Sequence, residues 1–147
     1  MYPSNTWPVI QLQRGRTMSG IEGIWRLVES RAWDKDGAPL EPPYGAHPLG
    51  EIIFSRGRML AALCNGDEEL KPSARRAYSS YGGLYTFDGA TLEVAVDMAS
   101  DPTRIGGRQV RGVEFLDQRR IVLRPPQRLY GESVERRELV WEQVLAF

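Results

Sequence analysis

The chain has 147 residues, which fits one domain large enough to bury roughly two-thirds of its unfolded surface. Lys+Arg and Asp+Glu balance at 19 each, so the basic excess typical of nucleic-acid or anionic-membrane binding is absent. The single cysteine, Cys64, excludes a disulfide within the chain, and no apolar run approaches the ~20 residues of a membrane-spanning helix. We therefore expect a cytoplasmic protein with no nucleic-acid or membrane partner.

Residues 1–18 are predicted to be a flexible leader, and residues 19–147 one folded domain. The leader lacks the basic start and apolar stretch of a signal peptide, and it contains Pro3 and Pro8 but no strand-like alternation. Met18 stands at its end and is an alternative start of translation.

The first strand is predicted to begin after Gly23, because apolar and polar residues alternate from Trp25 onward. A loop rich in proline and glycine follows, over residues 38–49. Residues 51–54 and 59–63 then flank a short turn that contains a glycine, which predicts a hairpin.

Residues 67–78 are the one segment with helical features. Asp67 is a typical helix N-cap, and Arg75 and Arg76 stand where they would favour a helix C-terminus. Pro72 interrupts the pattern. We therefore expect a short or broken helix here.

The remainder predicts strands joined by hairpin turns, of which Asp88-Gly89 is a strong example. About seven to nine short strands with no alternation of strand and helix favour a barrel or a sandwich, and closure removes the exposed sheet edges. The predicted fold is all-β, an antiparallel up-and-down barrel with one short helix. The later strands are predicted at residues 83–87, 91–98, 109–116, 120–124 and 136–144.

Several segments, in order along the chain, resemble the family of small bacterial and fungal lipocalin-like domains. Gly23-Ile24-Trp25 is similar to the Gly-x-Trp opening of lipocalin-type barrels. The other segments that carry the resemblance are His47 to Gly50, Ile52 to Met59, Tyr81 to Gly89, Gln109 to Arg111, and Leu139 to Glu142.

The resemblance covers about residues 21–144 and implies an up-and-down antiparallel barrel with a central cavity. It implies no single activity. The chain departs from the family pattern at Val94 and Ala95, near which many relatives would have a histidine. Any function of that histidine is absent or altered here.

Period two divides each strand of a barrel into an inner and an outer face. On the strand at residues 109–116, the face with Gln109, Arg111, Val113 and Phe115 has the bulkier apolar members and is predicted to point inward. On the strand at residues 92–98, the apolar stripe that ends in Val96 and Met98 is the predicted inner face, with Asp97 toward solvent.

An inward guanidinium needs a partner, because an unpaired buried charge is costly. For Arg111 the candidate partners are Glu142, Asp97 and a ligand carboxylate. The alternative is that Arg111 stacks on Trp25 and closes the barrel floor, as the resemblance to lipocalins implies.

Tyr81 and Tyr85 lie near the junction with the predicted helix, and their hydroxyls would suit an aromatic or polyketide-like ligand. Ordinary packing of these rings at a barrel end is the alternative. His47, the only histidine, lies in the proline-rich loop, where it would be a general base or simply an exposed loop residue.

The sequence thus predicts a protein that binds a small, largely apolar molecule, aromatic or polyketide-like, in the barrel cavity. Two alternatives stay open: a cofactor-free cyclase, isomerase or lyase acting on such a molecule, and a barrel filled by its own side chains. No cofactor is expected, and no metal, because one histidine and one cysteine lack ligand spacing. A homodimer also stays open. The predicted ligand-binding residues are Tyr85, Gln109, Arg111, His47, Phe54, Val96, Met98 and Phe115.

Overall fold

The computed structural model describes residues 20–130 and 132–147, so the leader predicted at residues 1–18 lies outside the described residues. Within this part the chain forms ten strands and one short 3-10 helix. They are β1 (Gly23–Asp34), β2 (Pro39–Leu40), β3 (Pro48–Ser55), β4 (Arg58–Asn65), β5 (Tyr78–Phe87), β6 (Thr91–Ala99), η1 (Pro102–Arg104), β7 (Arg108–Phe115), β8 (Arg120–Arg124), β9 (Arg128–Tyr130) and β10 (Ser133–Ala146).

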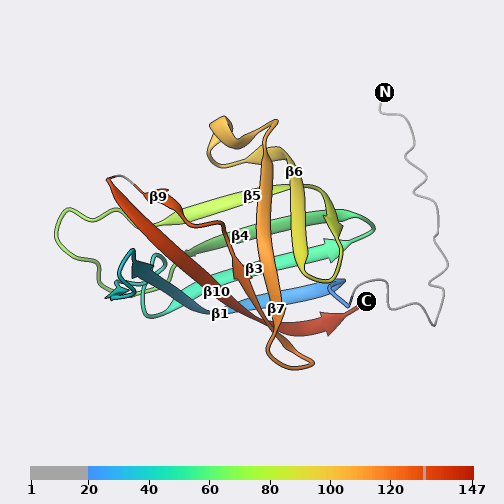
Figure 1. Ribbon diagram of the computed structural model, residues 1–147, viewed down its shortest axis with the longest axis horizontal. Helices are drawn as coiled ribbons and strands as arrows, with labels where there is room; N and C mark the ends of the chain where they lie inside the picture. The colour runs from blue at the N-terminus through green and yellow to red at the C-terminus, as the bar shows by residue number, and fades with distance from the viewer. Residues whose placement is uncertain (1–19, 131) are drawn as a thin grey trace.

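Each long strand pairs antiparallel with its neighbours, and the pairing of β10 with β1 closes the sheet into a barrel (Figure 1). The pairing order is β1-β3-β4-β5-β6-β7-β8-β10, and the short strands β2 and β9 extend it by pairing with β1 and β10. Closure leaves none of the eight main strands as a free edge. The predicted all-β antiparallel barrel is therefore confirmed.

One half of the barrel is packed with apolar side chains. Trp25 is fully buried there, and its indole Nε1 donates a hydrogen bond to the carbonyl oxygen of Ile21, at 2.8 Å. Phe54 and Tyr85 pack edge-to-face nearby, with ring centres 5.1 Å apart. The other buried members at this end include Met59, Leu92, Val94 and Ile121. This packed half is the hydrophobic core that fixes the barrel's shape.

The helix predicted at residues 67–78 is wrong, because residues 66–77 form an irregular loop. The Asp67 carboxylate accepts hydrogen bonds from the backbone N–H groups of His47 and Ala46, at 2.8 and 3.3 Å, instead of capping a helix. Pro72 removes one helical hydrogen bond, and the segment has too few apolar residues to bury a helix face. The one short helix in the described part of the chain is η1, which follows β6.

The alternation of β6 breaks near its end. Leu92, Val94 and Val96 are buried, as the apolar stripe predicts, but Met98 is 44% exposed. A register shift between Gly82 and Gly83 of β5 places one extra residue on β6 at this point. Such a bulge turns the following side chains to the other face.

No helix in the described part of the chain is long and apolar enough to cross a membrane. Over the same residues, no cluster of three or more histidine, cysteine, aspartate or glutamate side chains could hold a metal ion.

Candidate ligand-binding cavity

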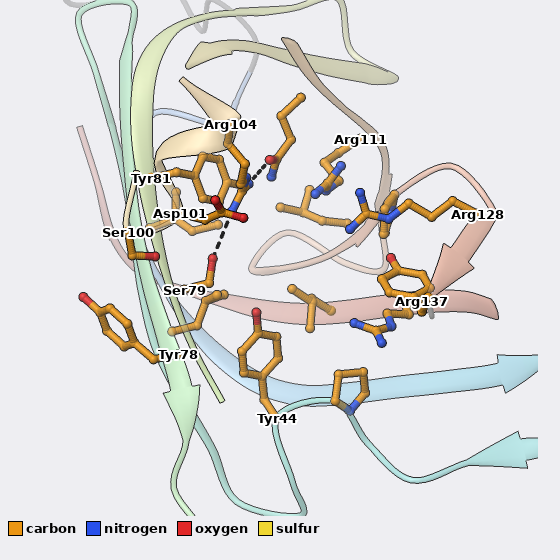
Figure 2. Close-up of a pocket in the computed structure, with 18 of the residues that line it drawn as sticks. Tyr44, Tyr78, Ser79, Tyr81, Ser100, Asp101, Arg104, Arg111, Arg128 and Arg137 are labelled. Carbon is orange, nitrogen blue, oxygen red and sulfur yellow. Dashed lines mark hydrogen bonds between the residues drawn. The ribbon is translucent and has the colours of Figure 1, made fainter. Parts of the chain in front are cut away.

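The other half of the barrel holds a cavity of about 500 Å³. Its volume lies within the range of ~300–1,000 Å³ that small-molecule sites occupy. Figure 2 shows that the side chains of Arg104, Arg111, Arg128 and Arg137 converge on this space, with the hydroxyl of Tyr44 directed into it. The apolar part of the wall consists of Pro43, Ile52, Leu63, Leu123, Pro125, Leu139 and Trp141.

Strand alternation places most of the lining. Ser79 and Tyr81 are two residues apart on β5, Gln109 and Arg111 on β7, and Arg137 and Leu139 on β10, so each pair points the same way. The inner faces of these strands line the cavity at one end of the barrel and form the packed core at the other. The barrel interior is thus apolar at one end and polar at the other.

Arg104 reaches the cavity from η1. The Asp101 carboxylate caps this helix by accepting from the backbone N–H and the hydroxyl of Thr103, at 3.0 and 2.7 Å. Two backbone hydrogen bonds between Val96 and the glycines that follow η1 hold the loop against β6. The Arg104 guanidinium then donates to Ser79 Oγ, at 3.0 Å, and to Gln109 Oε1, as the dashed lines in Figure 2 mark.

The Arg111 side chain lines the cavity, and it forms no ion pair with a described carboxylate. Its Nη1 donates to the carbonyl oxygen of Val110, at 2.8 Å. Burial lowers the pKa of the Arg111 guanidinium below its usual value, and the positive charges of Arg128 and Arg104 lower it further. Tyr81 offsets part of this effect. The cation therefore lies in an environment that disfavours positive charge.

Arg128 and Arg137 share the ring of Tyr130. The guanidinium carbons lie 4.6 Å and 3.4 Å from the ring centre, which are cation–π distances. Arg137 also pairs with Glu135, with Nη2 3.0 Å from Oε2. Among the residues that the structure describes, no carboxylate oxygen lies within 4.0 Å of the guanidinium nitrogens of Arg104, Arg111 or Arg128.

Two tyrosines face the arginines. Burial raises the pKa of the Tyr81 phenol, an effect that Arg111 and Arg104 partly offset. Burial likewise raises the pKa of the Tyr44 phenol, and a hydrogen bond with Ser79 lowers it in part. Both phenols are therefore neutral at physiological pH and can donate a hydrogen bond to a ligand.

A second hollow of about 320 Å³ adjoins the cavity between η1, the start of β7 and the Pro125-Pro126 turn. Arg108 and Val110 add to its wall, and Thr103, Arg104, Gln109, Arg111, Pro125 and Arg128 line both spaces. Arg104, Arg111 and Arg128 therefore lie between an inner chamber, the cavity of about 500 Å³, and an outer chamber, the second hollow.

The sequence profile of the lipocalin-like domain family matches residues 22–144, which is most of the chain. The chain belongs to the lipocalin-like domain family. The family resemblance predicted from the Gly-x-Trp strand and the later segments is confirmed. No curated protein sequence matches this lipocalin-like domain significantly.

Among solved structures, the domain is similar to two designed proteins. A redesigned β-barrel has 8% sequence identity and a TM-score of 0.42, with 85% of this chain and 92% of that chain covered. A de novo designed fluorescence-activating β-barrel has 11% identity and a TM-score of 0.40, with 83% and 92% covered.

The structure brings two of the predicted ligand-binding residues together in the cavity of this lipocalin-like domain: Gln109 and Arg111. Tyr85 and Phe54 belong to the packed core instead. Val96 is buried and lines the outer chamber.

The other three predicted residues lie away from the cavity. Met98 and Phe115 are 44% and 41% exposed. His47 lies on the surface, where its ring Nδ1 is 3.1 Å from the Asp67 carboxylate.

Sequence reasoning missed Arg104, Arg128, Arg137 and Tyr44. The first three lie on η1, β9 and β10, where no strong strand alternation indicates an inner face. Tyr44 comes from the proline-rich loop, in which the sequence predicts His47 as the ligand contact. The available signal was the high share of arginine among the basic residues, since Lys35 and Lys71 are the only lysines.

Proposed function

We propose that this lipocalin-like domain binds a small molecule in the barrel cavity, and that the molecule has an apolar body and an anionic group. The main support is the composition of the cavity wall. Leucine, isoleucine and tryptophan side chains make one part of it, and four arginines converge on the same space. Apolar walls supply most of the binding energy for such a ligand, while a few polar groups fix its orientation.

The charge balance supports an anion. Among the residues that the structure describes, Asp101 supplies the one carboxylate on the cavity wall, and its Oδ1 accepts two hydrogen bonds from Thr103. The guanidinium groups of Arg104, Arg111 and Arg128 have no carboxylate oxygen within 4.0 Å among the described residues. A bound anion would offset the cost of holding Arg104 and Arg111 partly buried and close enough for Arg111 to be repelled by Arg104 and Arg128.

The same wall supports binding more than proton-transfer chemistry. A cyclase, isomerase or lyase needs a group that takes up a proton near neutral pH. The hydrogen bonds from Thr103 hold the pKa of the Asp101 carboxyl below its usual value, which makes it a weak base. Burial raises the pKa of the Tyr44 and Tyr81 phenols, which keeps them neutral, and the arginines are donors only.

The experiment uses two dyes of matched shape: anilinonaphthalene sulfonate, which carries one negative charge, and N-phenylnaphthylamine, which carries none. Fluorescence titration should give one site per chain for the sulfonate, with an affinity at least about tenfold higher than that of the neutral dye. Equal affinities would contradict the anionic part of the proposal.

A cavity-filling variant tests the location. Ser79→Trp places an indole inside the cavity and should lower sulfonate affinity by about tenfold or more, because the ligand loses its space. Thr86→Trp is the matched control, since Thr86 is on the outward face of the same strand. Unchanged affinity in a folded Ser79→Trp variant would mean that the dye binds elsewhere, and it would overturn the proposal.

A further inference from the structure

The arginines of the cavity come from separate elements and approach the ligand space from separate directions. Arg104 is presented by η1, Arg111 by β7 and Arg128 by β9. Figure 2 shows Arg104 on one side of the space, and Arg111 and Arg128 on the other. An anion among them can therefore accept hydrogen bonds from several sides.

These three residues lie at the junction of the inner and outer chambers, because all of them line both spaces. Arg111 interacts unfavourably with the charges of both Arg128 and Arg104. A monoanion could neutralise only one of three cations. A dianion would offset more of their mutual repulsion without any change in the protein.

We propose that the anionic group of the ligand carries two negative charges, as a phosphate monoester does, and that it binds between Arg104, Arg111 and Arg128. This inference rests on the proposed function and names the ligand class more narrowly. The apolar body lies in the inner chamber, and the dianion lies at the junction with the outer chamber.

Phosphate fits this arrangement better than carboxylate does. Its three terminal oxygens point in different directions and accept charge-assisted hydrogen bonds, for which the guanidinium fork is well shaped. A carboxylate has two oxygens in one plane and is matched by a single fork. Donors on three elements therefore favour a tetrahedral group.

The test compares phenyl phosphate with phenyl sulfate, which have nearly the same shape but two charges and one charge at pH 7.5. In protein-detected NMR titrations, phenyl phosphate should bind at least about tenfold more tightly. The second pair is phthalate, a dianion without a tetrahedral group, and benzoate, a monoanion. If phthalate is preferred over benzoate as strongly as phenyl phosphate is over phenyl sulfate, any dianion suffices, and the preference for a tetrahedral phosphate is overturned.

The pH dependence separates charge from shape. The second pKa of a phosphate monoester is ~6, so the advantage of phenyl phosphate should disappear at pH 5 while phenyl sulfate binding stays constant. Equal binding of phosphate and sulfate at pH 7.5 would overturn the inference. The proposed function is tested by the dye titrations, so equal binding of phosphate and sulfate would leave it intact. A failure of the dye to bind would count against the proposed function itself.

Arg128→Gln provides a variant that should fold, because Arg128 is exposed at its end of the cavity. It should weaken phenyl phosphate binding by about tenfold and phenyl sulfate binding by less. Arg75→Gln is the control, since Arg75 is exposed on the loop at residues 66–77 and lines neither chamber. Equal effects of the two substitutions would contradict the assignment.

Discussion

The guanidinium carbon of Arg104 lies 4.2 Å from the centre of the Tyr81 ring, although η1 and β5 supply the two residues. The pair joins the loop after β6 to the inner wall of the barrel. The ring gives the cation a favourable surface, and the cation lies beside a phenol that burial keeps protonated. This contact helps to hold the Arg104 cation at the cavity, where none of the described carboxylate oxygens lies within 4.0 Å of its guanidinium nitrogens.

The pKa of Tyr81 predicts how stability changes at alkaline pH. Burial raises this pKa in the folded state above the ~10 of the unfolded chain, so the folded state holds its proton longer. The resulting stability is complete below pH ~10 and is lost as pH rises toward the folded pKa. Urea unfolding between pH 8 and 11 should therefore show a smaller decline for Tyr81→Phe than for the wild type. Identical declines would contradict the buried phenol.

Arg111→Lys keeps the positive charge but should weaken binding of anilinonaphthalene sulfonate by about tenfold, because an ammonium lacks the planar donor fork. Affinity and the free energy of unfolding should be measured on the same variant. The stacking of Arg111 on Trp25 that the sequence left open is not seen among the described residues, because Trp25 belongs to the packed half of the barrel and Arg111 to the cavity. Lowered stability with unchanged affinity would remove Arg111 from the ligand site.

His47→Ala should leave the affinity for anilinonaphthalene sulfonate unchanged, within about twofold. The His47 side chain is 81% exposed, and it contacts Asp67 and not the cavity. Fluorescence titration of the two proteins provides the comparison. A tenfold loss would restore His47 to the site predicted from the sequence.

Gly83→Ala should destabilise the protein by at least ~1–3 kcal/mol, because an added Cβ would lie 1.8 Å from the backbone oxygen of Ala95. Gly112→Ala is the matched control on β7, where the nearest atom to an added Cβ is 3.8 Å away. Denaturant unfolding of both variants should therefore separate them. Similar stabilities would contradict the close approach of β5 and β6 at the bulge.

Trp25→Ala should lower the free energy of unfolding by ~3–5 kcal/mol, since the indole is fully buried and its loss leaves a large hole in the core. It also removes the donor to the Ile21 carbonyl. Urea unfolding measures the effect. A loss below ~1 kcal/mol would mean that Trp25 is not part of the core.

The fold was predictable because its signals are local. Strand alternation, the Asp88-Gly89 turn and the Gly-x-Trp opening each depend on residues close together in sequence. The predicted helix failed for a tertiary reason, since the Asp67 side chain binds the backbone of the loop that carries His47. Local propensity contains no information about that contact.

The site was predictable only in part. Gln109 and Arg111 follow from the alternation of one regular strand. The same alternation predicts Met98 on the inner face of β6, but the bulge opposite Gly82 and Gly83 turns its side chain outward. Arg104 and Tyr44 reach the cavity from loops, whose paths depend on hydrogen bonds to distant residues.

A crystal structure of the protein with bound anilinonaphthalene sulfonate would show whether the cavity is the binding site. We expect the naphthalene ring against Leu63, Leu123 and Leu139, with the sulfonate within hydrogen-bond distance of the guanidinium groups of Arg104, Arg111 or Arg128. A cavity closed by these side chains, with the dye bound on the outer surface of the barrel, would contradict binding inside the barrel.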